Sequence, residues 1–418
     1  MTDPRWPLLR ASLDGLAPRY QDVLSALVAS PSVVGYERPA QRYLRDIAQD
    51  AGLAAELVEV DPLALQEDPR AGLTDLGREA RPNLVATLRG SGGGRSLALS
   101  GHVDVVPIGD REAWTRDPFS GHVADGRLHG RGALDMKGGL VAALHAIAAF
   151  RASGIPLRGD LVFESVIEEE ATGNGALAAR LHGPRVDAAI IPELSGEQVL
   201  IATPGVLWAE LTTTGRSAYV GRAGAAVNAI DVMLVLLDGL RSLPDALNAG
   251  FHHLAFSGSD APLTLNIGTI AGGDWPSSVP LRCRAGIRFS FPIGWPVDRA
   301  KAALRTRLAE IAADHPWLRE HPPTVRWHGF QAEGWDIDPG SPVVEMLATA
   351  IREETQGAAT TAPLLGTADA RFFRDAGIPA VYYGPTGDGQ HGPDEWVDLA
   401  SVARVTRVLA RAALAWCG

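Results

Sequence analysis

Histidines and acidic residues follow the strand-like apolar segments of this sequence. Four such segments, beginning near residues 97, 161, 188 and 381, each lead into an acid or a histidine. A further acid stands in a glycine-containing loop that opens an alanine-rich, helix-like segment. Together these positions supply His102, Asp104, Asp135, Glu168, Glu169, Glu170, Glu193 and His391. Because ligands of open α/β sheets bind beyond the carboxyl ends of the strands, we expect these side chains to converge.

Such a convergence would gather histidines and several carboxylates in one place. Buried carboxylates without partners are costly, so the group needs counter-charge, which two divalent cations would supply. Nitrogen and oxygen ligands without a thiolate suit Zn²⁺, and also Co²⁺ or Mn²⁺. Pairs of metal ions commonly share a bridging carboxylate and a bridging water. The residue types therefore predict a site for two metal ions.

Each piece also has a plainer interpretation when taken alone. A run of three glutamates is commonly a solvated surface, although this run directly follows a strand that looks buried. Asp135 could simply cap its helix, and His391 could be an ordinary loop histidine. We assign the histidines outside these segments to surface or core roles, among them His122, His129 and His145.

His102 and Asp104 stand two residues apart, which places their side chains on one face of an extended strand. Asp104 would then hold the far nitrogen of the imidazole and orient the ring. This arrangement favours a metal-binding histidine over an unrelated His-x-Asp pair.

Composition excludes several other classes of protein. The chain has 418 residues and a formal net charge of −11, without a basic block, so nucleic acid is not an expected partner. No apolar run looks long enough to cross a bilayer, and the N-terminal segment lacks the features of a secretory signal. Two cysteines, Cys283 and Cys417, cannot build a disulfide framework or a thiolate zinc site. We therefore expect a cytoplasmic protein.

The first 205 residues alternate helix-like and strand-like segments, which predicts an α/β catalytic domain with a mainly parallel sheet. Helices are expected at residues 18–29, 39–52, 138–153 and 175–181, and strands at 83–88, 95–106, 160–167 and 187–192. The glycine-rich run 90–94 lacks the Gly-Lys-Ser/Thr that ends a phosphate-binding loop. A hairpin turn between its two flanking strands is the preferred interpretation.

Residues 206–335 follow a different order, βαββαβ, which forms a compact unit by itself. The expected strands are 207–213, 263–270, 281–291 and 324–327, and the expected helices are 226–243 and 297–313. Residues 336–418 return to the α/β pattern, with a helix near 343–354 and a strand at 380–383. The sequence thus predicts a catalytic domain (1–205 and 336–418) interrupted by an inserted domain (206–335).

These motifs resemble the metallohydrolase family of acetylornithine deacetylase, succinyl-diaminopimelate desuccinylase, carboxypeptidase G and aminoacylase. The resemblance covers nearly the whole chain, and its motifs appear in the family's order. Their sequences are Ser-Gly-His-Val-Asp-Val-Val-Pro at 100–107, Gly-Arg-Gly-Ala-Leu-Asp-Met-Lys-Gly-Gly at 130–139, Glu-Glu-Glu-Ala-Thr-Gly-Asn-Gly at 168–175, Gly-Thr-Ala-Asp-Ala-Arg at 366–371 and His-Gly-Pro-Asp-Glu at 391–395.

The resemblance implies a zinc-peptidase-like catalytic domain and a ferredoxin-like lid that forms a homodimer. It implies that Asp135 bridges two metal ions, most commonly zinc. His102 and Glu193 would complete one metal site, and Glu170 and His391 the other.

The resemblance also implies roles in catalysis and substrate binding. Glu169 would be the general base and Asp104 the residue behind the metal-binding histidine. Arg288 resembles the family's arginine for a substrate carboxylate, a task that suits a guanidinium, although an exposed strand arginine is an equal alternative. Thr367 and Arg371, from the motif at 366–371, would also contact the substrate.

Some positions depart from the family pattern. Tyr219 stands where family members usually carry a lid histidine that donates to the oxyanion in the partner's active site. A tyrosine hydroxyl is also a donor, so Tyr219 could keep this role, or it could mark altered chemistry. His252 or His253 could act instead. Glu168 replaces the usual aspartate, and Ser278 replaces a common asparagine.

The sequence therefore predicts an enzyme that removes the acyl group from an N-acyl amino acid by means of a metal-activated water. The alternatives are a dipeptidase or carboxypeptidase with the same chemistry, a repurposed enzyme of acyl transfer or biosynthesis, and a binding protein that kept only the fold. The last of these predicts a lost ligand or base, yet every expected position is filled.

Overall fold

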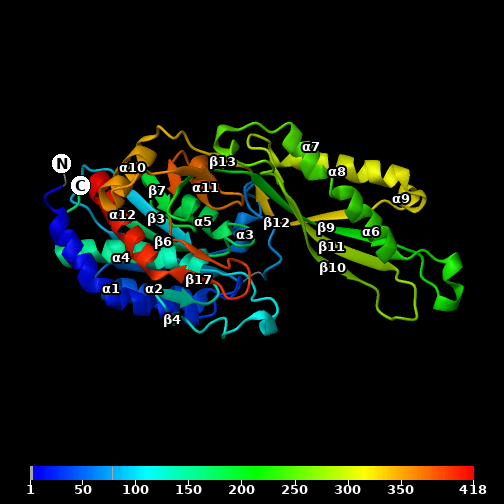
Figure 1. Ribbon diagram of the computed structural model, residues 1–418, viewed down its shortest axis with the longest axis horizontal. Coiled ribbons are helices and arrows are strands. Elements are labelled where there is room, and N and C mark those ends of the chain that lie inside the picture. The colour runs from blue at the N-terminus through cyan, green and yellow to red at the C-terminus, as the bar shows by residue number, and fades with distance from the viewer. Residues whose placement is uncertain (1–2, 78) are drawn as a thin grey trace.

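The computed structural model of the protein describes residues 3–77 and 79–418. Two lobes lie end to end along the long axis of the molecule, and both chain ends lie at the outer end of the larger lobe (Figure 1). The larger lobe contains a nine-stranded sheet and the smaller lobe a four-stranded sheet. Each sheet therefore organises its own lobe.

The nine-stranded sheet has the order β1-β2-β6-β3-β7-β15-β8-β13, with β14 paired to β8. Its central neighbours β6, β3, β7 and β15 run parallel, and antiparallel strands flank them. The α/β class with a mainly parallel central sheet is thus confirmed. The strands are β1 (Ala54–Val60), β2 (Arg81–Leu88), β3 (Leu97–His102), β6 (Leu161–Val166), β7 (Ala188–Ile191), β8 (Val199–Thr203), β13 (Trp335–Asp336), β14 (Thr361–Pro363) and β15 (Ala380–Tyr382).

Helices on both faces cover this sheet. On one face, α4 is surrounded by α1 and α12, with α2 and α10 beside them. The helices of the larger lobe are α1 (Trp6–Ala29), α2 (Arg38–Asp50), α3 (Pro62–Leu65), α4 (Gly138–Ser153), α5 (Asn174–His182), α10 (Pro342–Thr355), α11 (Ala370–Asp375) and α12 (Leu399–Cys417). The alanine-rich helix α4 is apolar on all sides, which is typical of a helix buried in a core.

Among the described residues, one helical stretch, Ala133–Ser153, has the length and apolar composition of a membrane span, although the sequence analysis expected no apolar run long enough. All residues of its most apolar part are buried inside the protein, so this stretch is a central helix of the core.

The four-stranded sheet is antiparallel throughout, with the order β10-β11-β9-β12. Helices α6 and α8 pack against it and enclose a hydrophobic core separate from that of the larger lobe. Its elements are β9 (Gly205–Thr214), α6 (Ala229–Leu240), α7 (Leu243–Ala249), β10 (Leu265–Gly272), β11 (Arg282–Phe291), α8 (Val297–Asp314), α9 (Pro316–Glu320) and β12 (Thr324–Ala332). We propose domain boundaries after residues 205 and 335, because this separate core lies between them.

A third, small sheet brings two distant loops together near the edge of the larger lobe. It joins β4 (His122–Ala124) and β5 (Arg127–His129) to β16 (Gly387–Asp388) and β17 (Trp396–Asp398). The loop that carries His391 runs between β16 and β17.

The predicted hairpin at residues 90–94 is wrong. Strand β6 lies between β2 and β3, so the glycine-rich run crosses over the end of β6 instead of turning back. A Cβ atom at Gly90 would overlap the main chain of Arg158 and Gly159, so this crossing requires glycine.

Several predicted boundaries also need correction. Helix α1 begins at Trp6 instead of residue 18 and accommodates Pro18 within it. The helix predicted at 226–243 is shorter, because α6 covers only Ala229–Leu240. Strand β12 continues to Ala332 instead of ending at 327. Strands β1 and β8 and helix α12 were not predicted, since their burial depends on neighbours that are distant in the sequence.

Candidate active site

The five predicted metal-binding side chains come together beyond the carboxyl ends of the central strands. His102 is the last residue of β3, and Glu193 follows β7 by two residues. Glu170 lies in the loop between β6 and α5, and Asp135 lies in the turn that leads into α4. His391 reaches the same place from the loop between β16 and β17.

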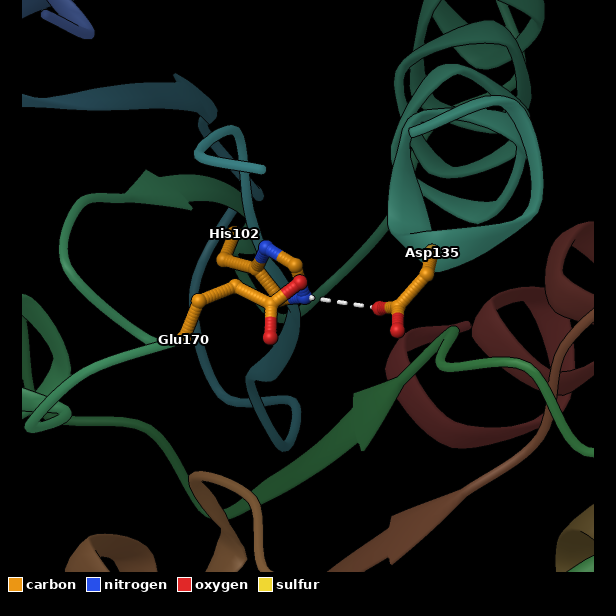
Figure 2. A group of neighbouring side chains, drawn as sticks. All are labelled: His102, Asp135 and Glu170. Atoms are coloured by element: carbon orange, nitrogen blue, oxygen red, sulfur yellow. Dashed lines mark hydrogen bonds and ion pairs between the residues drawn. The ribbon is translucent and has the colours of Figure 1, made fainter. Parts of the chain in front are cut away.

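Asp135 stands between the two histidines. Its Oδ1 atom lies 3.2 Å from Nε2 of His102, and its Oδ2 atom lies 3.2 Å from Nε2 of His391. Figure 2 shows the side chains of His102, Asp135 and Glu170 pointing toward one another. One carboxylate therefore faces two separate imidazoles.

A further carboxylate completes each half of the cluster. Oε1 of Glu193 lies 3.3 Å from Nε2 of His102, and Oε2 of Glu170 lies 3.1 Å from Nε2 of His391. The combinations His102–Asp135–Glu170 and His102–Glu169–Glu193 each offer atoms within 4.8 Å of one another. These two combinations share His102. The distances given above also define one group of nitrogen and oxygen atoms around His102 and another around His391, and Asp135 belongs to both groups.

Glu169 is buried at the edge of the cluster. Its Oε2 atom lies 3.8 Å from Nε2 of His102, while its Oε1 atom has no hydrogen-bond partner. Burial raises the pKa of Glu169 well above its ordinary value, against the opposing effect of His102. A carboxylate with a free oxygen and a raised pKa is suited to exchange a proton.

Asp104 supports the cluster in a different way from the one predicted. The Nδ1 atom of His102 lies 2.9 Å from the main-chain carbonyl of Asp104 and 3.8 Å from its carboxylate. The carboxylate instead accepts hydrogen bonds from the main-chain N–H groups of Glu169 and Glu170, over 3.1 and 3.0 Å. Asp104 therefore holds the ring with its backbone and the acidic loop with its side chain.

The acids of the cluster outnumber the imidazoles beside them. Hydrogen bonds with Asp135 and Glu170 raise the pKa of His391 to about 11. Burial raises the pKa of Glu193 to about 7 despite the nearby His102. Burial alone would lower the pKa of His102, but Glu193 and Asp135 raise it well above its ordinary value. The site is short of positive charge, which suits bound cations.

Thr367 lines a small cavity over the cluster, and its contact with substrate stays a prediction. The cavity has a volume of about 110 Å³, and Leu194, Leu364 and Gln390 also line it. Its walls combine the acids of the cluster with two leucine side chains.

Arg371 lies buried behind this wall. Its guanidinium donates to the carbonyls of Thr172 and Ala368, over 2.8 and 3.1 Å, and to the hydroxyl of Thr367 over 3.3 Å. These bonds tie the acidic loop to the segment beside the cavity. Substrate binding by Arg371 stays a prediction.

The other predicted residues, Arg288 and Tyr219, lie in the smaller lobe. Arg288, on β11, donates to the hydroxyls of Thr264 and Ser290. Tyr219 is 71% exposed, and none of the hydrogen bonds or ion pairs of the described residues joins it to the cluster of acids and histidines. Tyr219 pairs instead with Ser278 in an isolated bridge, so two positions that depart from the family pattern lie side by side.

Glu395 is a buried residue to which the sequence analysis gave no role. It ends the motif that contains His391, and its carboxylate contacts the loop that carries Asp135. Its position in the motif at 391–395 was the available signal.

A sequence profile of peptidase family M20/M25/M40 matches residues 98–415, more than half of the chain. The chain belongs to this family. The predicted resemblance is thereby confirmed, and the chain is an amide-bond hydrolase of the M20 type.

Relatives of this M20 chain include enzymes that are named for the removal of different acyl groups. It is 32% identical to a succinyl-diaminopimelate desuccinylase of Methylobacterium radiotolerans, over 92% of this chain and 93% of the relative. It is 28% identical to an N-formyl-4-amino-5-aminomethyl-2-methylpyrimidine deformylase of Halalkalibacterium halodurans, over 90% and 89% of the two chains.

The fold of this M20 chain also matches solved structures. Human carnosine dipeptidase 1 superposes with a TM-score of 0.78 over 99% of both chains, at 18% identity. At this identity the comparison establishes the fold alone.

Proposed function

We propose that this protein removes the acyl group from an N-acyl amino acid, by amide hydrolysis at a site that holds two divalent cations. The main support is the position of Asp135, whose two oxygens face His102 and His391 separately. A buried glutamate with a free oxygen, Glu169, stands beside this arrangement.

The residues present fit a pair of cations. His102 and Glu193 would hold one ion, His391 and Glu170 the other, and Asp135 both. Nitrogen and oxygen ligands favour Zn²⁺, with Co²⁺ or Mn²⁺ as alternatives. When bound, such ions polarise a carbonyl group and lower the pKa of water.

The chain's own residues would move the proton. Glu169 accepts a proton from the attacking water and returns it to the nitrogen of the leaving amine. The bond between the amide carbonyl carbon and nitrogen breaks, which yields a carboxylic acid and a free amine. Asp104 keeps Glu169 in position through its hydrogen bond to the main chain.

A homodimer formed through the smaller lobe is part of this proposal. Strand β10 is an edge strand, and edge strands present unpaired N–H and C=O groups. Ile270 of this strand and Leu234 and Val235 of the neighbouring helix α6 are exposed. A second copy covering this face would carry Tyr219 toward the active site of its partner, where the hydroxyl would donate to the oxyanion.

We also place the protein in the cytoplasm, because both cysteines are buried free thiols.

The experiment that tests the function combines metal analysis with a panel of N-formyl, N-acetyl and N-succinyl amino acids and dipeptides. We expect two divalent ions per chain, release of free amine from one acyl class, and loss of activity on chelation that Zn²⁺ restores. Preferential cleavage of dipeptides would instead establish the peptidase alternative. Full activity in a metal-free protein would refute the two-metal mechanism.

A further inference from the structure

A buried ion pair stands directly behind the cluster and belongs to neither group of ligands. Glu395 is fully buried and Arg131 is 2% exposed. Nη1 of Arg131 donates to Oε2 of Glu395 over 2.6 Å. We call this pair the bracket.

Glu395 holds the loop that ends in Asp135. Its carboxylate accepts hydrogen bonds from the main-chain N–H groups of Gly132, Leu134 and Asp135, over 3.0, 2.9 and 3.1 Å. With the bond from Arg131, the two oxygens accept four hydrogen bonds. A carboxylate fits this place because it only accepts, and every neighbour donates.

Arg131 connects the same point to the loop that carries His391. Its Nη2 atom donates to the carbonyl of Gly392, the residue after His391, over 3.0 Å. The N–H group of Gly130 also donates to the main-chain carbonyl of Glu395, over 2.8 Å. The bracket therefore joins the two segments that supply Asp135 and His391.

The two histidines depend on this connection to different degrees. His102 is the last residue of β3 in the middle of the main sheet, and it is 1% exposed. The side chain of His391 is 53% exposed, and its φ of +57° places it in a turn between two very short strands. A residue on such a loop owes its position to the contacts that anchor the loop.

We propose that Glu395 and Arg131 are positioning residues that set the distance between His391 and Asp135. They thereby maintain the ion position formed by His391, Glu170 and Asp135. This inference rests on the proposed two-metal function. Residues behind metal ligands commonly orient them, and their loss weakens metal binding by about 10- to 100-fold.

The substitution Glu395→Gln tests the bracket with almost no change of shape. A glutamine offers one accepting oxygen where four donors converge, and its amide N–H groups would face other donors. The matched control is Glu354→Gln. Glu354 is a carboxylate, 5% exposed, that pairs with arginines of α1 and α12 and has no contact with the cluster.

The measurement is calorimetric titration of each metal-free protein with Zn²⁺, accompanied by melting temperatures. We expect the wild type and Glu354→Gln to bind two ions. Glu395→Gln should bind the ion held by His391 about 10- to 100-fold more weakly, and the ion held by His102 should be weakened less, because Asp135 contacts both histidines but only His391 lies on a loop that the bracket anchors. Arg131→Met, which leaves Glu395 bonded to the loop amides, should weaken the ion held by His391 in the same direction, and it carries the test if Glu395→Gln does not fold.

Other results separate the two proposals. Two ions bound by the variants as tightly as by the wild type, or both ions weakened equally, would overturn the bracket while the two-metal function stands. A wild-type protein that binds no Zn²⁺ would overturn the proposed function, and the bracket with it.

Discussion

The carboxylate of Asp104 accepts a hydrogen bond from the main-chain N–H of Glu169 over 3.1 Å. This bond joins the segment after β3 to the loop after β6, two neighbouring parallel strands. The orientation of the proposed general base therefore depends on a residue that follows a different strand.

Asp104→Asn should lower kcat about 10- to 100-fold with little change in KM. An asparagine side chain keeps one accepting oxygen, but its amide group faces an N–H of the acidic loop, so the loop shifts. Steady-state kinetics with the best substrate of the panel would measure the effect. An unchanged kcat would show that the side chain of Asp104 does not position the base.

Glu169→Gln should lower kcat about 10²- to 10⁴-fold, because a glutamine cannot accept the proton of the attacking water. The number of bound metal ions should stay at the wild-type value, since Glu169 is not assigned as a ligand. Glu354 is a buried carboxylate outside the cluster, so the variant Glu354→Gln should keep wild-type kinetics. Loss of metal in Glu169→Gln would instead make this residue a ligand.

Tyr219→Phe should lower kcat with little change in KM, because the lost hydroxyl is proposed to contact the oxyanion in the partner subunit. Neither Glu169→Gln nor Tyr219→Phe should be active alone at the wild-type level. Refolding the two variants together would place an intact Glu169 and an intact Tyr219 in one of the two sites of each mixed dimer. Roughly a quarter of all sites should then recover.

Recovered activity in the mixture requires that Tyr219 acts across subunits. Wild-type kcat in Tyr219→Phe would exclude the hydroxyl as a donor. Sedimentation of the wild type checks the dimer independently, and a monomer would contradict the role of Tyr219 in a partner site.

His145 should make the folded protein less stable in mild acid. It lies in α4, where its ring stacks on Tyr20 and its Nε2 atom contacts the carbonyl of Leu13 over 3.0 Å. Burial lowers the pKa of His145 to about 4, from 6.5. The unfolded chain therefore binds a proton below pH 6.5 that the folded chain does not bind until about pH 4.

The contribution of His145 to the free energy of unfolding should thus fall as the pH falls through this window, by up to about 3 kcal/mol. His145→Gln keeps an N–H donor for Leu13 but does not titrate, so its stability should fall less between about pH 7 and about pH 4. Urea unfolding at several pH values measures the difference, with His182→Gln, on the exposed end of α5, as the control. Parallel curves for wild type and His145→Gln would contradict the prediction.

The sequence by itself determined the class of fold and the residues that gather in the site. One apolar strand ends in His102, and two others lie just before Glu170 and Glu193. These strands indicated where the carboxyl ends of a parallel sheet would bring the three side chains together. The alanine-rich segment predicted the buried helix α4 with its correct bounds. These features are local, because consecutive residues determine the hydrophobic periodicity of a segment.

Only the tertiary structure decided how distant segments pair. In the sheet, β6 lies between β2 and β3, so the segment predicted as a hairpin is a crossover. The tertiary structure directed Nδ1 of His102 to a carbonyl instead of the carboxylate of Asp104. It also brought Glu395 to the loop of Asp135, 260 residues away in the chain. Such contacts depend on strand order and on which N–H and C=O groups remain unpaired after packing, and a pattern of residue types carries neither.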